Sequence, residues 1–320
     1  MRGSENRWHP VGIVAFLGIG LILYASLFVW SDRNLRNHSY GNPFYRISVA
    51  PEHSNWIILG ASHALPLGFS DIPDLVSDRT GKHIETLAMT GGGPLTWRVL
   101  AQRYFADRTA DAVLIMLDDF GFAYARWNGK RLGDADILPK IPADFRTIAV
   151  FAGTARQEFP VGTLAAYATG FARINDHTRF DIDRWDGEGR FDTAPRPSDA
   201  ADRARVAFLY PGPADQEAIS QGLANLEAVI RHAQSRNAFV VVLRPPLPDR
   251  FRTQLPEMPG FEKRLLALLE ARGVSLLDFS AQIPEPHYYF DTDHLNRKGV
   301  ERFLDEVLLE LLRHGDDRGQ

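Results

Sequence analysis

Short apolar runs that end at turn residues, with helical patterns between them, constrain this chain more than any other feature. The first run begins at Trp56 and ends in Gly-Ala-Ser at residues 60–62. An apolar run of this length, bounded by turn residues, predicts a buried strand. On this criterion we expect five strands, at residues 55–60, 84–88, 112–117, 239–243 and 275–278.

Helical periodicity fills the segments between these strands. We expect helices at about 96–105 and 261–269, and a closing helix through residue 312 with Asn296 as its N-cap. Strands that alternate with helices favour a parallel sheet with helices on both faces. The predicted fold is therefore an α/β, three-layer, doubly wound parallel sheet. A further helix is expected after Pro213, because Ile219, Leu223, Leu226 and Ile230 recur at spacings that place them on one helical face.

The alternation stops between about residues 121 and 212. This stretch has aromatic content in its first half and dense mixed charge from Asp176 to Arg205. We interpret it as an insertion over the active edge of the sheet, partly mobile, within a single domain that spans residues 55–320.

The N-terminal region predicts a membrane anchor. Residues 11–30 contain no charged side chain, and Trp8 and Trp30 flank them. A bilayer core requires about 20 apolar residues in a helix, with aromatic side chains at its boundaries. The alternative is a cleaved signal peptide, but bulky residues stand where a cleavage site requires small ones.

The predicted anchor sets the organisation of the first 54 residues. We expect residues 1–31 to form a cytoplasmic tip and a transmembrane helix, and residues 32–54 to form a polar tether. Long domains translocate largely regardless of charge, so we place the main domain outside the cytoplasm on a single-pass inner-membrane anchor.

Composition narrows the classes of partner. The formal net charge is -4 and the chain lacks a basic stripe, which argues against nucleic-acid binding. The absence of cysteine excludes disulfides and thiolate metal sites. We expect no cofactor and no metal ion.

Ser62 is the candidate nucleophile. It follows the first predicted strand, at the carboxyl edge where open α/β sheets bind ligands. It also stands where a helix would begin, so its backbone N–H could stabilise an oxyanion. The alternative role is a helix-capping serine, which is common after a strand.

Asp291 and His294 are the candidate orienting acid and base. Three residues apart across a turn, the carboxylate can hold Nδ1 of the imidazole while Nε2 faces the serine. The alternative is a capping aspartate beside a surface histidine. Asp293 is adjacent to His294 and points elsewhere in most turns. His63 is adjacent to Ser62 and would not face it on a helix.

Substrate contacts are expected at two other strand ends. Gly91 and Gly92 follow the second strand, where glycine lets backbone N–H groups approach an oxyanion, although a plain turn would look the same. Arg244 ends the fourth strand and could hold an anionic group, or it could form a structural ion pair.

Three short blocks together resemble the SGNH (GDSL-like) hydrolase superfamily. They are Gly-Ala-Ser-His at 60–63, Gly-Gly-Gly at 91–93 and Asp-Thr-Asp-His-Leu-Asn at 291–296. The resemblance covers about 55–120 and 213–313. With the anchor, it is closest to the DltD-like proteins and to the alginate-type O-acetylation proteins, which work beside a membrane-bound O-acyltransferase.

The resemblance implies a flavodoxin-like sheet and a Ser62–His294–Asp291 triad. It also implies an asparagine oxyanion donor after the third strand. Asp118 and Asp119 stand there instead, and a carboxylate does not donate unless it is protonated. Asn128 is the next asparagine that could substitute.

The sequence therefore predicts an extracytoplasmic O-acyltransferase or esterase that acts on acyl, chiefly acetyl, esters of a cell-envelope polysaccharide. Two alternatives remain. One is a non-catalytic scaffold or glycan-binding partner of a membrane-bound O-acyltransferase, and the other is a plain esterase without a glycan partner.

Overall fold

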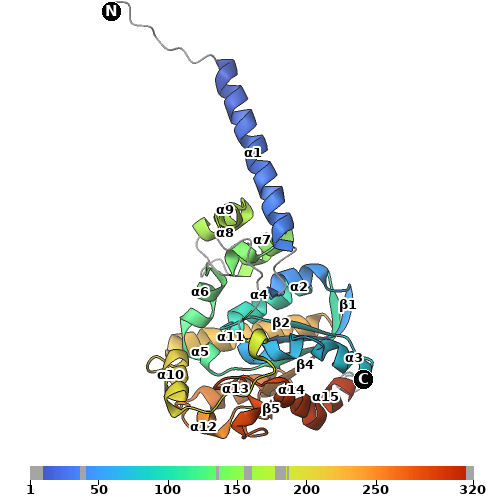
Figure 1. Ribbon diagram of the computed structural model, residues 1–320, viewed down its shortest axis with the longest axis vertical. Helices are drawn as coiled ribbons and strands as arrows, with labels where there is room; N and C mark the ends of the chain where they lie inside the picture. Colours follow the sequence, from blue (N-terminus) through green and yellow to red (C-terminus); the bar gives the residue numbers. More distant parts are fainter. Residues whose placement is uncertain are drawn as a thin grey trace, which may run out of the picture.

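A single five-stranded, all-parallel sheet forms the centre of the protein (Figure 1). The computed structural model describes residues 10–36, 41–134, 137–154, 161–176, 185 and 187–314. The strand order is β2-β1-β3-β4-β5, which is a doubly wound order. All five predicted strands are confirmed, and they are β1 (His53–Gly60), β2 (Ile84–Ala88), β3 (Thr109–Met116), β4 (Phe239–Arg244) and β5 (Leu276–Asp278).

Two apolar cores pack on opposite faces of this sheet. Along β1, Ile57 and Leu59 face one core, while Trp56 and Ile58 face the other. Strands buried on both faces read as continuous apolar runs, which is why the sequence revealed them. The first core is covered by α2 (Pro43–Val49), α4 (Pro94–Tyr104), α11 (Gln216–Ser235) and α13 (Phe261–Ala271), and the second by α3 (Ile72–Thr80), α14 (Arg297–Phe303) and α15 (Leu309–His314).

The closing helix is confirmed in place, with one interruption. The Asn296 side chain accepts from the Gly299 N–H and caps α14, as expected. A π-helical turn, η6 (Leu304–Leu308), then separates α14 from α15. Leu304, Leu308 and Leu312 remain buried across it, so the apolar stripe continues into the core.

The N-terminal helix α1 (Pro10–Arg36) is long and apolar enough to span a membrane. Its apolar window is wholly exposed, and it stands away from the sheet in Figure 1. Its last turns are fastened to the domain. The Asp32 carboxylate accepts from the N–H of Ala143, and Arg36 donates to the carbonyl of the same residue.

The predicted tether at residues 32–54 is wrong. Helix α1 continues to Arg36, and α2 packs Phe44 and Ile47 into the first core. Asn42 caps α2 by accepting from the Phe44 N–H. Polar residues dominate the stretch, but two large apolar side chains are enough to fix a short helix on the sheet.

The regular elements among the described residues of the insertion are all helices, and they divide into two groups. One group lies beside α1 in Figure 1, and the other lies at the carboxyl edge of the sheet. The expectation of a cover over the active edge therefore holds only for the second group. The first comprises α7 (Phe145–Thr154), α8 (Val161–Ala168) and α9 (Phe171–Asn175), and the second α5 (Phe120–Ala123), η2 (Ala125–Trp127), α6 (Gly129–Leu132) and α10 (Asp199–Leu209).

Five short elements complete the described chain. They are η1 (Ser62–Gly68), η3 (Leu138–Lys140), η4 (Glu188–Arg190), α12 (Asp249–Arg252) and η5 (Pro286–Tyr288).

Candidate active site

Ser62 lies where the sequence placed it, two residues after β1. It opens the 3-10 helix η1, so its N–H has no partner within that helix. The serine is 2% exposed, and its hydroxyl is not a helix cap, because the N-cap position falls on Ala61 without a side-chain bond. The capping alternative for Ser62 is therefore excluded.

His294 reaches Ser62 from the other end of the chain. The distance from Nε2 of His294 to Oγ of Ser62 is 2.8 Å. On its other side, Nδ1 of His294 lies 2.9 Å from each carboxylate oxygen of Asp291. A ring that donates from Nδ1 to a carboxylate is left to accept at Nε2, so it can take the serine proton.

The loop before α14 holds this arrangement rigidly. Asp291 Oδ1 accepts from the N–H groups of Asp293 and His294 as well as from the ring. The N–H of Phe290 donates to the carbonyl of His294, which closes the turn. Burial raises the pKa of Asp291, but His294 outweighs burial and holds that pKa below its usual range.

A second histidine–carboxylate network adjoins the first. His63 does not contact Ser62. Its Nδ1 instead lies 2.5 Å from Asp118 Oδ1, and its Nε2 lies 3.2 Å from Asp293 Oδ2 without hydrogen-bond alignment. Asp293 is fully buried, and Arg205 from α10 donates to both of its oxygens, at 3.2 and 2.9 Å.

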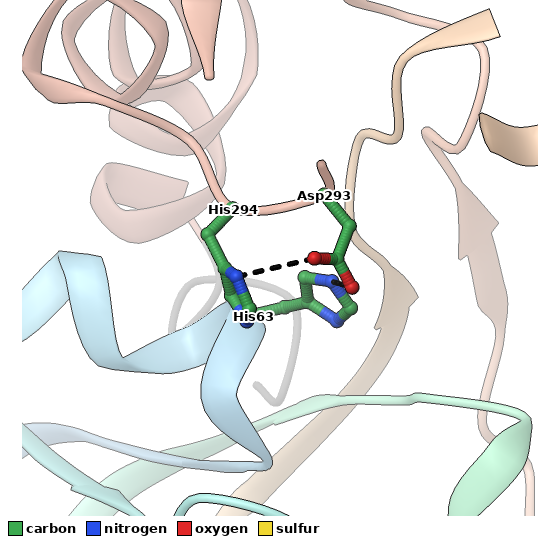
Figure 2. A group of neighbouring side chains, drawn as sticks. All are labelled: His63, Asp293 and His294. Carbon is green, nitrogen blue, oxygen red and sulfur yellow. Dashed lines mark ion pairs between the residues drawn. The ribbon is translucent and has the colours of Figure 1, made fainter. Parts of the chain in front are cut away.

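Figure 2 shows how the two networks meet. The Asp293 carboxylate lies beside both rings, and its Oδ1 is 3.2 Å from Nδ1 of His294. The ring centroids of His63 and His294 are 4.8 Å apart. Asp293 is thus closer to the site than its adjacency to His294 suggested, although Nδ1 of His294 donates to Asp291.

The charges of this cluster do not favour a metal ion. Ligand-type atoms of His63, Asp293 and His294 lie within 4.8 Å of one another. However, the Arg205 guanidinium occupies both oxygens of Asp293, and both ring nitrogens of His294 have partners. A divalent cation would have to displace the partly buried Arg205 guanidinium, so we interpret the cluster as a network of paired charges.

The charge on His63 predicts a pH-dependent stability. Burial lowers the pKa of His63, but Asp118 and Asp293 outweigh it and raise that pKa from 6.5 to about 10. Between these values the folded state binds more protons than the unfolded state, so stability falls as the pH rises. The free energy of unfolding of the parent protein should therefore fall between pH 6.5 and pH 9.5, and we expect His63→Gln to reduce this fall by a few kcal/mol. The measurement is denaturant unfolding of the detergent-solubilised protein at the two pH values.

The matched control is the half-exposed His83, whose replacement by Gln should leave this fall unchanged. An unchanged fall in His63→Gln as well would contradict a charged His63.

A pocket of about 430 Å³ opens next to Ser62. Its wall is cationic and aromatic. The Arg126 guanidinium lies 4.2 Å from the Trp127 ring centroid and 5.0 Å from that of Phe208, and Arg131 is paired with Asp134. The lining residues are Ser62, Thr90, Gly91, Phe120, Arg126, Trp127, Lys130, Arg131, Asp134, Arg205, Phe208 and Leu209.

The glycines expected as oxyanion donors lie in different surroundings. Gly91 lines the pocket with Ser62 and has a φ of 66°, a conformation that glycine adopts without strain. Gly92 does not serve, because its N–H donates to the carbonyl of Met89 at 2.8 Å.

Asn128 was also wrongly predicted as a donor. Its amide nitrogen donates to the carbonyl of Gly121, while its oxygen accepts from the Leu95 N–H. This buried amide therefore ties the end of η2 to α5 through its nitrogen and to the start of α4 through its oxygen. Asp118, at the place of the expected asparagine, is instead the partner of His63.

Arg244 is a structural residue and not an anion site. Its guanidinium is paired with three carboxylates, those of Asp119, Glu262 and Asp278. Burial raises the pKa of Asp119 to about 6, although Arg244 opposes the rise. With three acids around one cation, Arg244 has no charge to offer an anionic ligand.

Sequence reasoning missed the residues that the insertion contributes. Arg205 and Phe208 come from α10, and Trp127 from η2. Trp185 packs edge-on against the His294 ring, with centroids 4.8 Å apart. The only signal was the arginine and aromatic content of the insertion, which does not show which side chains point to the site.

Comparison with known proteins adds no family assignment. None of the models of known protein families matches this chain. No curated protein matches it either. The function is therefore inferred from the geometry of the side chains at the site.

Proposed function

We propose that this protein is a membrane-anchored serine O-acyltransferase or esterase of the SGNH type, acting on acyl esters of a cell-envelope glycan. One observation carries the proposal. Ser62, His294 and Asp291 form a continuous line of 2.8 and 2.9 Å contacts, although 232 residues separate the serine from the histidine. Such a line is the geometry of an activated hydroxyl nucleophile.

The chemistry follows from the direction of these bonds. Oγ of Ser62 attacks the acyl carbonyl carbon, and its proton passes to Nε2 of His294. Ser62 and Gly91 both line the pocket, and their backbone N–H groups would stabilise the oxyanion. As the tetrahedral intermediate collapses, His294 returns the proton to the departing alcohol, and the acyl group remains on Ser62 as an ester.

The second half of the reaction uses the same residues. His294 takes a proton from an acceptor hydroxyl, which attacks the acyl-serine and restores the free Ser62. A sugar hydroxyl gives transfer, and water gives hydrolysis. Asp291 stabilises the imidazolium that forms in each half-reaction.

The pocket and α1 support a glycan of the cell envelope as the acceptor. Trp127 and Phe208 provide aromatic surface of the kind that packs against sugar rings, and Arg126 and Lys130 add positive charge. A membrane-spanning α1 would keep the reaction at a membrane, which we propose to be the inner membrane with the domain in the periplasm. A membrane-bound O-acyltransferase is the natural source of acyl groups there.

A non-catalytic scaffold is the second candidate. It is favoured by Asn128, whose amide donates to the carbonyl of Gly121 and which is not among the residues that line the pocket. Such a protein would keep the pocket but would not acylate Ser62. Reactivity of the serine separates the two functions.

A fluorophosphonate probe tests the proposal directly, because it reacts covalently only with an activated serine. We expect the full-length protein in detergent to be labelled, and Ser62→Ala to lose all labelling. Ser235→Ala is the matched control, since the Ser235 hydroxyl is exposed and donates only to the carbonyl of His232. Absence of labelling in the parent protein would support the scaffold instead.

A further inference from the structure

The group of helices beside α1 presents apolar side chains that the domain does not cover. Phe145, Val161 and Phe171 are 70%, 77% and 57% exposed. Residues 161–172, which include all of α8, contain no charged side chain. An apolar stretch of about 10–14 residues is too short to span a bilayer and is typical of interfacial or re-entrant segments.

Direct contacts fix the height of this group along α1. The Tyr24 hydroxyl donates to the carbonyl of Thr169, between α8 and α9, at 3.1 Å. The Arg173 guanidinium lies 4.8 Å from the Phe28 ring centroid. Gly170, with a φ of 76°, has no room for a Cβ because the Phe28 ring fills that space.

These contacts fall within the apolar part of α1. Tyr24 precedes Trp30, the end of the uncharged stretch, by six residues, which is about 9 Å of helix at 1.5 Å per residue. If α1 crosses a bilayer with Trp30 at the boundary between headgroups and acyl chains, Thr169 lies about 9 Å to the acyl-chain side of that boundary. Interfacial helices bury their apolar face about 5–10 Å into that boundary.

We propose that α8 and α9 form a membrane-embedded hairpin that docks the domain onto the bilayer crossed by α1. Their uncovered apolar side chains continue the lipid-facing surface of α1, where Val14 and Phe16 are 69% and 76% exposed. Figure 1 shows α8 and α9 level with the lower part of α1, on the membrane side of the sheet. The occupant of this surface is lipid, and the inference is independent of the chemistry at Ser62.

The absence of native cysteine makes a direct test possible. Single cysteines are introduced by Val161→Cys and Phe171→Cys in the full-length protein, labelled with an environment-sensitive fluorophore, and reconstituted into phosphatidylethanolamine–phosphatidylglycerol vesicles. Val14→Cys in α1 is the positive control. Leu266→Cys on α13, which is 47% exposed and remote from α1, is the matched control.

The test compares quenching of each label by doxyl lipids, which act from the acyl chains, with quenching by iodide, which acts from the water. We expect doxyl lipids to quench the labels at 161 and 171 about threefold more than the label at 266, and aqueous iodide to quench them about threefold less, because an interfacial side chain sits at acyl-chain depth. Iodide quenching equal to that at 266 would overturn the proposal. Protection from both quenchers would also overturn it, since a protein partner would then cover the hairpin.

Failure of the anchor itself would be recognised separately. It would appear as a label at residue 14 that doxyl lipids do not quench. In that case the hairpin has no bilayer to enter, and the proposal fails with it, whereas the fluorophosphonate labelling of Ser62 is unaffected.

Discussion

Asp291→Asn is expected to lower the rate at which Ser62 reacts with a fluorophosphonate, or turns over an acetyl ester, by about 10⁴-fold. Asp291 Oδ1 accepts two backbone N–H groups, so the amide nitrogen of an asparagine would replace Oδ2 beside the His294 ring. That nitrogen donates toward Nδ1 and competes with Oδ1 for it, which favours the tautomer with the ring proton on Nε2, facing Ser62. A protonated Nε2 cannot take the serine proton.

The rate is measured on the full-length protein in detergent, from the extent of fluorophosphonate labelling in reactions stopped at successive times. Asp192→Asn is a matched control, because Asp192 is 71% exposed and pairs only with Arg297 among the described residues. We expect the control to keep the parental rate. A loss of less than about tenfold in Asp291→Asn would show that another group orients His294, and Asp293 would then be the candidate.

Asp293→Asn is expected to destabilise the folded protein by about 3–5 kcal/mol. Asp293 is fully buried, and its single negative charge lies against Arg205, His63 and His294. Burial raises the pKa of Asp293, but these neighbours outweigh burial and hold that pKa well below its usual range. Removing the charge would leave a guanidinium and an imidazolium close together in the interior with one carboxylate fewer.

The change is measured as the shift in the denaturant midpoint of the detergent-solubilised protein at neutral pH. Asp291→Asn serves as the comparison, because the Asp291 side chain is 21% exposed and should cost less stability. Equal stability of Asp293→Asn and the parent would mean that the buried charges are not paired in solution. The two substitutions together separate a residue needed for reactivity from one needed for the fold.

The sheet could be predicted because its signal is local. The four longer strands are largely buried on both faces, so an apolar run such as Trp56–Leu59 identifies a strand without knowledge of its neighbours. Ser62 followed from the same signal, because it comes directly after a strand at the edge where such sheets bind ligands. Asp291 and His294 were recognised by their three-residue spacing just before the closing helix. Asn296 was predictable for a similar reason, because a cap acts within one turn.

The remaining site residues depend on contacts that sequence does not encode locally. Arg205 reaches Asp293 from a helix with no strand pattern to position it, and Asn128 is committed by two backbone groups distant from it in sequence. Arg244 looked available for ligands, but three acids that neutralise it come from separate elements. The tether failed because polar composition hid the two core residues of α2, Phe44 and Ile47.

The rigid junction at Asp32 and Arg36 limits where this protein can work. A flexible linker over residues 32–54 would let the domain roam through a radius of about 25 Å. Hydrogen bonds from the final turns of α1 to Ala143 remove that freedom. With α1 in a bilayer, Ser62 would stay at a nearly constant distance from the membrane surface. Substrates would therefore have to reach Ser62 at that distance.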